Sequence, residues 1–209
     1  MNDLDAVELR VLGCLIEKQR TTPDAYPLSL NSLRLAANQS TNREPVMELD
    51  EPTIRVALQR LGDRGFTRLA SGAGSRAIKY RHLLDDALSL TPSQLAVLAV
   101  LMLRGPQTPG ELKTRTERLY PFGTLDDLHR TLAELGDREL VERLPRRPGQ
   151  KEDRVRQLLG TADEGEPAAR SQPSSLPDDE RTKMDELEAR LARVEAKLDE
   201  LMRALDADG

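Results

Sequence analysis

The sequence predicts a mainly α-helical protein with small β-hairpins: two tandem winged-helix (helix-turn-helix) domains followed by a C-terminal amphipathic helix. Three observations predict this fold class. The segment LGDRGFTRL at 61–69 returns 74 positions later as LGDRELVER at 135–143. In each copy, three apolar patterns of helical period precede two short alternating segments. A heptad repeat then follows near the end of the chain.

The first helix of each copy is expected to begin with a capping box, in which the N-cap residue and the residue three positions later exchange hydrogen bonds. The motif is DAVE at 5–8 in the first copy and TPSQ at 91–94 in the second. Both helices are apolar over more than one stripe, which indicates burial on several sides. Another capping box, TPGE at 108–111, is expected to begin the second helix of copy two, and its counterpart in copy one is expected at 29–38.

The third helix is expected to begin at Asp50 in the first copy and at Thr124 in the second, again 74 residues apart. Gly65 is suited to end the first of these helices in the left-handed conformation. Glu139 stands at the equivalent position of the second copy, so we expect that helix to end by other means. The stripes expected to be buried are Ile54, Leu58 and Leu61 in the first copy, and Leu125, Leu128, Leu132 and Leu135 in the second.

Two alternating segments follow each third helix and predict a hairpin, the wing of a winged helix. The pairs of segments are 66–69 with 77–81 in the first copy, and 140–144 with 153–158 in the second. These elements place winged-helix domain 1 at 1–86 and winged-helix domain 2 at 87–160. The alternative is a three-helix unit with a hairpin that carries no particular function.

The remaining sequence predicts a flexible linker at 161–177 and a heptad helix at 178–207. The linker is rich in Pro, Ser, Ala and acidic residues and has no apolar periodicity. The heptad pattern predicts a homodimer through a coiled coil; a lone amphipathic helix docked on its own globular part is the alternative. The predicted dimerisation residues are Met184, Leu187, Leu191, Val194, Leu198, Leu201 and Leu205.

Composition argues against several classes of function. Hydrophobic residues make up 38% and charged residues 32%, which is typical of a soluble protein. Aromatic residues make up only 2%, so a stacking platform for single-stranded nucleic acid is not expected. The apolar run from Leu95 to Leu103 is much shorter than the roughly 20 residues of a membrane span, and residues 1–10 carry no export signal. We therefore expect a cytoplasmic protein without a membrane partner.

No catalytic residue, metal ligand or cofactor site is expected, so the sequence does not predict an enzyme. His82 and His129 lie in unrelated contexts, without cysteines or carboxylates at metal-ligand spacing. SGAGSR at 71–76 matches neither a phosphate loop nor a dinucleotide fingerprint. Cys14 lies among apolar residues and is expected to be a buried, inert thiol.

Charge is unevenly distributed along the chain, whose net charge is −5. Residues 161–209 contain 14 Asp or Glu and 7 Lys or Arg, a net charge of −7, so residues 1–160 carry +2. Residues 51–82 contain seven Lys or Arg and two Asp or Glu, a net charge of +5. This charge lies on the third helix and wing of domain 1, where a winged helix meets DNA.

We therefore predict double-stranded DNA as the partner and a transcriptional regulator as the function. The helix would contact base edges and the wing would contact phosphates. The alternative is a solvated face with scattered ion pairs. The predicted DNA-binding residues are Thr53, Arg55, Gln59 and Arg60 on the helix, and Arg76, Lys79 and Arg81 on the wing.

The third helix of the second copy has the opposite character. Its acidic residues are Asp126, Asp127, Glu134 and Asp137, which phosphates would repel. Domain 2 is therefore expected to be a structural module or to bind a protein partner. For the whole chain, the alternative function is a protein–protein interaction scaffold or adaptor of tandem winged helices that does not bind DNA.

Five segments resemble the YceH family of uncharacterised bacterial proteins, and the resemblance covers nearly all of residues 4–159. It implies a pair of winged-helix domains in a cytoplasmic protein, with no established biochemical function. The segments are LGCLIEKQRTTPDAYPLSLNSL (12–33), NQSTNREPVM (38–47), SGAGSRAIKY (71–80), LRGPQTPGEL (103–112) and RRPGQKE (146–152).

The resemblance implies that NQSTNREPVM joins the second helix to the third helix of domain 1. Asn38, Asn42 and Arg43 within it have two interpretations. They can contact phosphates at the entrance to the third helix, or they can satisfy their own backbone in a structural connection, which is the usual behaviour of such side chains in loops. The sequence favours the structural connection.

Overall fold

The computed structural model describes residues 4–70, 78–146 and 152–160. They belong to one compact unit, Met1–Asp163, and Glu164–Gly209 forms a second unit. The predicted linker, the predicted heptad helix with its seven dimerisation residues, and Arg76 lie outside the described residues. The dimerisation seam and the predicted domain bounds therefore stay predictions.

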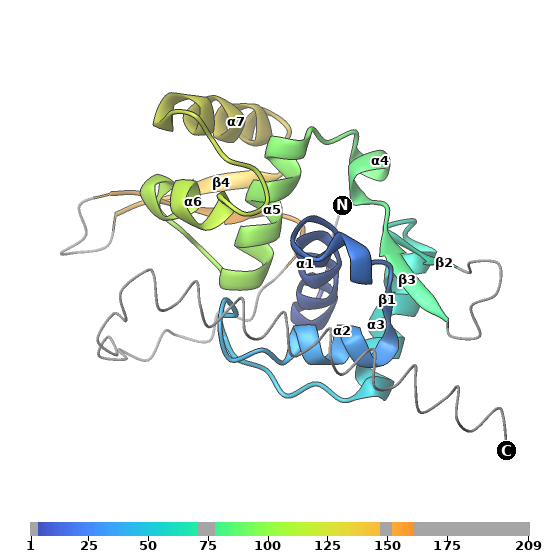
Figure 1. Cartoon of the computed structure of the whole chain (residues 1–209). Coiled ribbons are helices and arrows are strands. Elements are labelled where there is room, and N and C mark those ends of the chain that lie inside the picture. Colours follow the sequence, from blue (N-terminus) through green and yellow to red (C-terminus); the bar gives the residue numbers. More distant parts are fainter. Residues whose placement is uncertain (1–3, 71–77, 147–151, 161–209) are drawn as a thin grey trace, which may run out of the picture. The chain divides into compact units, whose positions relative to one another are not determined.

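The described chain is mainly helical with small antiparallel sheets, as predicted (Figure 1). Three helices followed by a hairpin occur twice in the same order. The first copy contains α1 (Ala6–Thr21), the 3-10 turn η1 (Pro23–Ala25), β1 (Leu28–Ser29), α2 (Leu30–Ala37), α3 (Glu51–Asp63), β2 (Thr67–Ala70), β3 (Lys79–His82) and α4 (Leu84–Leu88). The second contains α5 (Pro92–Arg104), α6 (Pro109–Thr116), α7 (Leu125–Asp137), β4 (Val141–Leu144) and β5 (Arg154–Gln157).

The repeat extends to a third strand position that the sequence did not suggest. In the first copy, β3 lies between β2 and the short β1, and Leu28 pairs with Tyr80. In the second copy, β4 pairs with β5, and an isolated antiparallel bridge joins Gln107 to Val155. Gln107 therefore occupies the place beside β5 that β1 occupies beside β3.

The capping boxes predicted at Asp5, Thr91 and Thr108 are confirmed. In the first, the Glu8 amide donates to Asp5 Oδ1 and the Asp5 amide donates to Glu8 Oε2, each at 2.8 Å. Thr124 begins α7 with the same arrangement. These local hydrogen bonds satisfy amides that a helix start leaves free, which explains why the sequence located the helix starts correctly.

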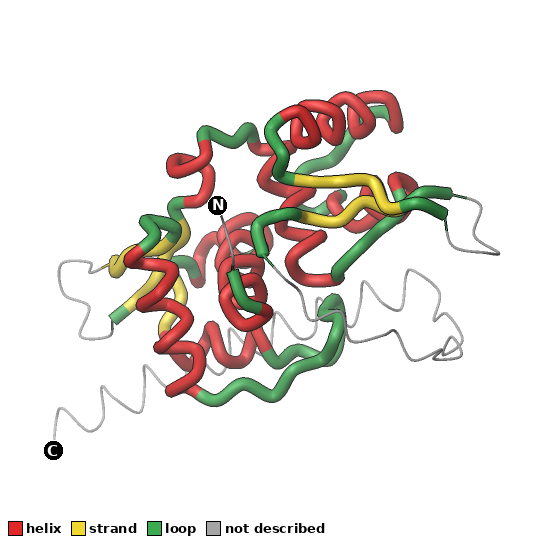
Figure 2. The backbone as a smooth tube through the Cα atoms, turned by 180° about the vertical axis from the view of Figure 1, so that it is seen from behind, coloured by secondary structure: helices red, strands yellow, loops and turns green. Residues whose placement is uncertain are grey.

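Helices α1 and α5 form the centre of the unit, as their apolar sequences predict (Figure 1). Residues 8–16 of α1 and 94–103 of α5 are buried without a break. The two helices approach closely at Gly13, where a Cβ atom would lie 2.9 Å from the Leu103 side chain. The third helices, α3 and α7, lie at opposite ends of this unit in both views (Figures 1 and 2).

One residue of the predicted buried stripes is exposed. Leu125 is 42% exposed, because it is the first residue of α7 and lies at the end of the stripe. The other members of the two predicted stripes are buried. The stripe therefore positions each third helix from its second turn onwards.

The expectation that α7 ends differently from α3 is wrong. Glu139 has φ of 54° and Gly65 has φ of 75°, so both residues adopt the left-handed conformation. In both copies the amide of this residue donates to the carbonyl three residues earlier, at 2.9 Å. A side chain in this conformation costs about 1 to 2 kcal/mol. The helix-ending hydrogen bonds and the burial of the following residue, Leu140, offset that cost.

Candidate nucleic-acid interface

Four of the predicted DNA-binding residues lie on the exposed face of α3. Thr53, Arg55, Gln59 and Arg60 are all exposed, while the opposite stripe of the helix is buried in the core. Arg55 and Gln59 are one helical turn apart and project from the same side. The N-cap Asp50 fixes the start of this face, since its carboxylate accepts a hydrogen bond from the Thr53 amide at 2.9 Å. Hydrogen bonds from Thr53 also lower the pKa of Asp50.

Arg60 already has a carboxylate partner. Its Nη1 atom lies 3.0 Å from Oδ2 of Asp5, the N-cap of α1. The Arg60 side chain is 58% exposed and the Asp5 side chain 48% exposed. Ion pairs this exposed contribute about 0 to 1 kcal/mol, so a phosphate group can replace the carboxylate at little cost.

The register of the first hairpin gathers cations on one of its faces. Arg68 is paired directly with Arg81, and Ala70 with Lys79. Because side chains alternate between the two faces of a strand, Arg68, Lys79 and Arg81 share a face, which we call the wing face. The opposite face packs on the helices: Thr67 is buried there and its hydroxyl donates to the Leu58 carbonyl of α3 at 3.2 Å.

The wing face places two positive charges directly opposite each other on neighbouring strands. Like charges directly opposite each other on neighbouring strands are destabilising. In the described part of the chain, no ion pair joins Arg68, Lys79, Arg81 or the helical Arg55 to a carboxylate. The buried Nε atom of Arg81 also has no hydrogen-bond partner there. Ion pairs with carboxylates of the described residues therefore do not offset the repulsion between these cations.

Sequence reasoning missed Arg68 as a site residue. The signal was present, because Arg68 alternates with Thr67 and Leu69 in a predicted strand. What the sequence lacked was the register, which places Arg68 beside Arg81. The structure thus brings Arg68, Lys79 and Arg81 together on the hairpin, while Arg55 and Gln59 lie on a separate element.

His82, at the end of β3, connects the hairpin to α1. Its ring is buried, and Nε2 lies 2.7 Å from Oε1 of Gln19 in α1. The His82 amide donates to the Tyr26 hydroxyl at 2.8 Å. Burial lowers the pKa of His82 to about 4, although Asp85, with Oδ1 3.5 Å from Nδ1, acts in the opposite direction.

We expect His82 to make the protein less stable in mild acid. The unfolded chain takes up a proton near pH 6.5 and the folded chain only near pH 4. Above pH 6.5 His82 is neutral in both states and the free energy of unfolding is unaffected. As the pH falls from 6.5 towards 4, protonation of the unfolded chain lowers the free energy of unfolding by up to about 3 kcal/mol. Urea unfolding at a series of pH values measures this loss.

The variant His82→Gln should reduce the pH dependence between these values. The other histidine of the chain, His129, provides the matched control, because it lies on the surface side of α7 and is only partly buried. An equal reduction in His129→Gln would contradict the assignment to His82.

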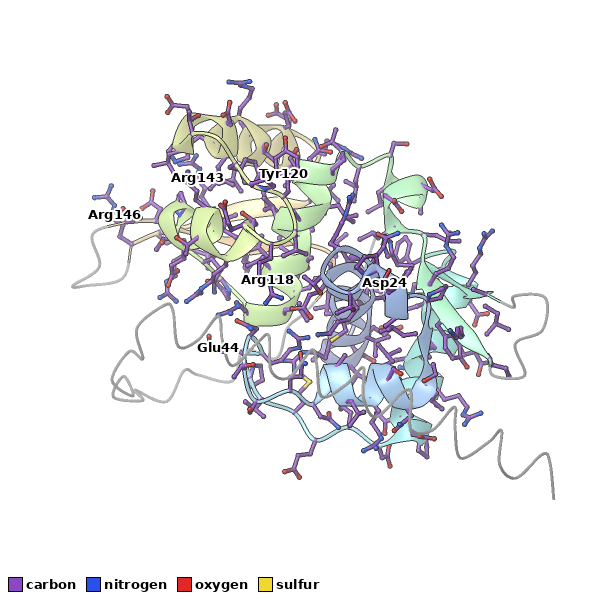
Figure 3. The ribbon with its side chains drawn as sticks, in the orientation of Figure 1. Asp24, Glu44, Arg118, Tyr120, Arg143 and Arg146 are labelled. Carbon is purple, nitrogen blue, oxygen red and sulfur yellow. The ribbon has the colours of Figure 1, made fainter. Side chains whose placement is uncertain are left out.

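The loop between α2 and α3 serves the fold, as the sequence favoured. The Asn38 amide group donates to the Leu49 carbonyl, and the Leu49 amide donates to Asn38 Oδ1, both at 2.8 Å. Arg43 is buried, and its Nη2 atom lies 2.5 Å from Oε2 of Glu17 in α1. Glu44 lies on the part of this loop that reaches the end of α5 (Figure 3), and its amide donates to the Leu103 carbonyl at 2.8 Å.

The exposed cations of α3 have no counterparts at the equivalent positions of α7. Given the 74-residue offset, His129, Ala133 and Glu134 stand where Arg55, Gln59 and Arg60 stand in α3. Glu134 accepts a hydrogen bond from Gln94 at 2.9 Å.

The hairpin of the second copy also differs from the wing face. Arg156 pairs with Glu142 across the strands, and Arg146 pairs with Asp153 at 3.0 Å. Figure 3 shows Arg146 beyond the end of β4, on the part of the hairpin that extends from the helices. Two of its cations are thus matched by carboxylates, whereas those of the wing face have no such partner within residues 4–70, 78–146 and 152–160.

Three further features of the described residues concern metal binding, the single thiol and membrane insertion. No group of His, Cys, Asp or Glu within 4–70, 78–146 and 152–160 is arranged to hold a metal ion. The thiol of Cys14 is buried, as predicted, and burial raises its pKa. None of the helices in these ranges has both the length and the apolar character needed to cross a membrane.

Comparison with known proteins places the chain in a family. Residues 4–150 match the family described as "Protein of unknown function, DUF480". A UPF0502 protein of Geotalea uraniireducens is 47% identical over 203 residues, which covers 95% of this chain and 90% of the relative. A UPF0502 protein of Shewanella amazonensis is 43% identical, over 95% of this chain and 97% of the relative. One of Azotobacter vinelandii is 51% identical, over 77% of this chain and 71% of the relative. The resemblance read from the sequence is therefore confirmed: the chain belongs to the DUF480 family, the UPF0502 proteins that include YceH.

Proposed function

We propose that this protein binds double-stranded DNA as a transcriptional regulator, and that its repeated unit is a winged helix. The observation that carries the proposal is the wing face, where Arg68 and Arg81 are directly opposed and have no carboxylate partner among the described residues. A DNA phosphate between them would relieve their repulsion and accept charge-assisted hydrogen bonds.

The exposed face of α3 provides the second part of this proposed interface. Arg55 can donate two hydrogen bonds to guanine, and Gln59 can make the equivalent contact with adenine, in the major groove. In this proposed arrangement, Lys79, Arg68 and Arg81 position the duplex through its phosphates, and Arg55 and Gln59 of α3 read the base sequence. Arg76 belongs to the same proposed wing but lies outside the described residues.

The second copy is proposed to have a different role. Its α7 carries Asp126, Asp127, Glu134 and Asp137, which phosphates would repel, and α3 and α7 lie at opposite ends of the unit. A protein partner with a basic surface fits α7 better. The heptad residues 184–205 remain the proposed means of forming a homodimer.

DNA binding is tested by titrating the full chain with duplex DNA at several salt concentrations. If the wing face contacts two phosphates, Arg68→Ala/Arg81→Ala should reduce the slope of log affinity against log salt by about 2. Arg55→Ala should weaken binding by about 1 to 3 kcal/mol and relax sequence preference. A screen of random duplexes supplies the preferred sequence.

The matched control removes two arginines from the second hairpin. Arg143→Ala/Arg146→Ala changes the net charge by the same amount, and Arg143 and Arg146 are both exposed (Figure 3). We expect this variant to bind nearly as tightly as the parent. Salt-insensitive binding, or equal losses in the two double variants, would contradict the proposal and favour the adaptor without DNA binding.

A further inference from the structure

The β2–β3 hairpin carries two aliphatic side chains on the face opposite the wing face. Leu69 pairs with Tyr80, and Ile78, which immediately precedes β3, lies two residues from Tyr80. Because side chains alternate between the two faces of a strand, Leu69 and Ile78 share a face and are diagonal neighbours. At the other end of this face, Thr67 and His82 are buried. The hairpin therefore packs on the helices at its base and extends into solvent at its far end.

The two aliphatic side chains at that far end are strongly exposed. Leu69 is 62% exposed and Ile78 is 60% exposed, the two largest fractions among the large hydrophobic residues of 4–70, 78–146 and 152–160. The hairpin lies at the outer edge of the unit in both views (Figures 1 and 2). Single exposed aliphatic residues are common on protein surfaces, whereas these two are neighbours on one projecting hairpin. We call Leu69 and Ile78 the apolar pair.

Cations border the apolar pair along both strands. Arg68 directly precedes Leu69, and Lys79 directly follows Ile78. Together, β2 and β3 contain three Lys or Arg and no Asp or Glu. A partner complementary to this hairpin has anionic groups beside a surface that accepts aliphatic side chains. The minor groove of DNA meets both requirements, since phosphates line its walls and stacked bases form its floor.

We propose that Leu69 and Ile78 insert between neighbouring base pairs from the minor groove and bend the duplex. This inference rests on the proposed function, because the cations of the wing face bring the hairpin to the DNA. Two paired strands lie about 4.8 Å apart before their side chains are counted, and the minor groove is about 6 Å wide. Entry of the hairpin therefore requires the groove to open. Apolar side chains that separate a base step in this way kink a duplex by about 20 to 90°.

Insertion gives the hairpin a sequence preference of its own. The cost of separating two base pairs depends on the step, and pyrimidine–purine steps such as TA and CA/TG are the most easily kinked. The hairpin therefore favours deformable steps, without hydrogen bonds to their bases. This preference adds to the one that Arg55 and Gln59 of α3 provide through base contacts.

The test measures bending by energy transfer between dyes at the two ends of a duplex of about 30 base pairs, chosen from the screen of random duplexes. Such a duplex is nearly straight when free, because the persistence length of DNA is about 150 base pairs. The parent should increase the transfer, and Leu69→Ala/Ile78→Ala should lose most of the increase and bind about three- to tenfold more weakly. The slope of its log affinity against log salt should equal that of the parent, since no phosphate contact is removed.

The random-duplex screen supplies a second measurement. Sequences selected by the parent should be enriched in TA or CA/TG steps at one fixed position, and sequences selected by Leu69→Ala/Ile78→Ala should lose that enrichment. The control is Leu125→Ala/Leu158→Ala, which removes two exposed leucines of the second copy, 42% and 37% exposed. This control should bend the duplex as the parent does.

The outcomes separate this inference from the proposed function. If the parent binds duplex DNA and leaves it straight, or if Leu69→Ala/Ile78→Ala bends it as the parent does, the inference is overturned and DNA binding stands. Equal losses of bending in the two double variants would also overturn it. If the parent binds no duplex DNA at all, the proposed function and the inference both fail.

Discussion

Replacing Glu17 with glutamine is expected to lower the free energy of unfolding by about 3 to 5 kcal/mol, because it leaves the buried charge of Arg43 without a counterion. The Arg43 side chain is 0% exposed and the Glu17 side chain 14% exposed. Arg43 Nη1 and Nη2 lie 3.1 and 2.5 Å from the two carboxylate oxygens. Burial opposes ionisation of Glu17, but the charge and hydrogen bonds of Arg43 outweigh it and lower the pKa to about 2.

The remaining donors of Arg43 hold the loop that precedes α3. Nε donates to the Ala36 carbonyl at 3.0 Å, and Nη2 donates to Gln39 Oε1 at 3.0 Å. Loss of the carboxylate therefore weakens the connection that sets the position of α3, as well as the ion pair. Urea unfolding at pH 7 measures the expected loss.

An exposed pair supplies the control for Glu17→Gln. Asp153 pairs with Arg146 at 3.0 Å, but the two side chains are 40% and 64% exposed. The same carboxylate-to-amide change, Asp153→Asn, should cost less than about 1 kcal/mol. Comparable losses in the two variants would show that burial does not set the strength of the Glu17–Arg43 pair.

The variant Gly160→Ala is expected to lower the free energy of unfolding by about 2 to 3 kcal/mol. A Cβ atom at this position would overlap the carbonyl oxygen of Leu4 and lie 2.7 Å from the Leu4 amide nitrogen. The obstacle is backbone, so it cannot rotate away, and Leu4 must leave its site. The cost is that of exposing a fully buried leucine. Thermal or urea unfolding measures it.

Gly136 in α7 is the matched control for Gly160→Ala. It lies in a helix, and a Cβ atom there would have no neighbour within 4 Å. Gly136→Ala should therefore stabilise the protein by up to about 1 kcal/mol, since alanine loses less backbone freedom on folding. A neutral outcome for Gly160→Ala would mean that the Leu4 contact contributes little to stability.

Much of the fold could be predicted because it depends on short-range signals. The capping boxes at Asp5, Thr91 and Thr108 each involve residues only three positions apart, and the sequence located all three helices correctly. The end of α7 is the exception. Glu139 has an intrinsic preference against the left-handed conformation, and hydrogen bonds within the helix end overrode it.

The candidate site could be predicted only in part. The sequence identified the exposed face of α3, since exposure follows from the position of the buried stripe. It could not identify the wing face, because the pairing of Arg68 with Arg81 requires the strand register. It also could not reveal that Arg60 pairs with Asp5, because these residues lie 55 positions apart.

The sequence by itself determined the family, the repeated order of helices and hairpin, and the excess of cations in residues 51–82. Tertiary structure alone decided which cations have partners. Glu17 neutralises Arg43 inside the core, Asp5 contacts Arg60 at the surface, and Arg68 faces Arg81. The physical reason is that Coulomb energy depends on the distance between charges and on their exposure to water, and the folded chain sets both.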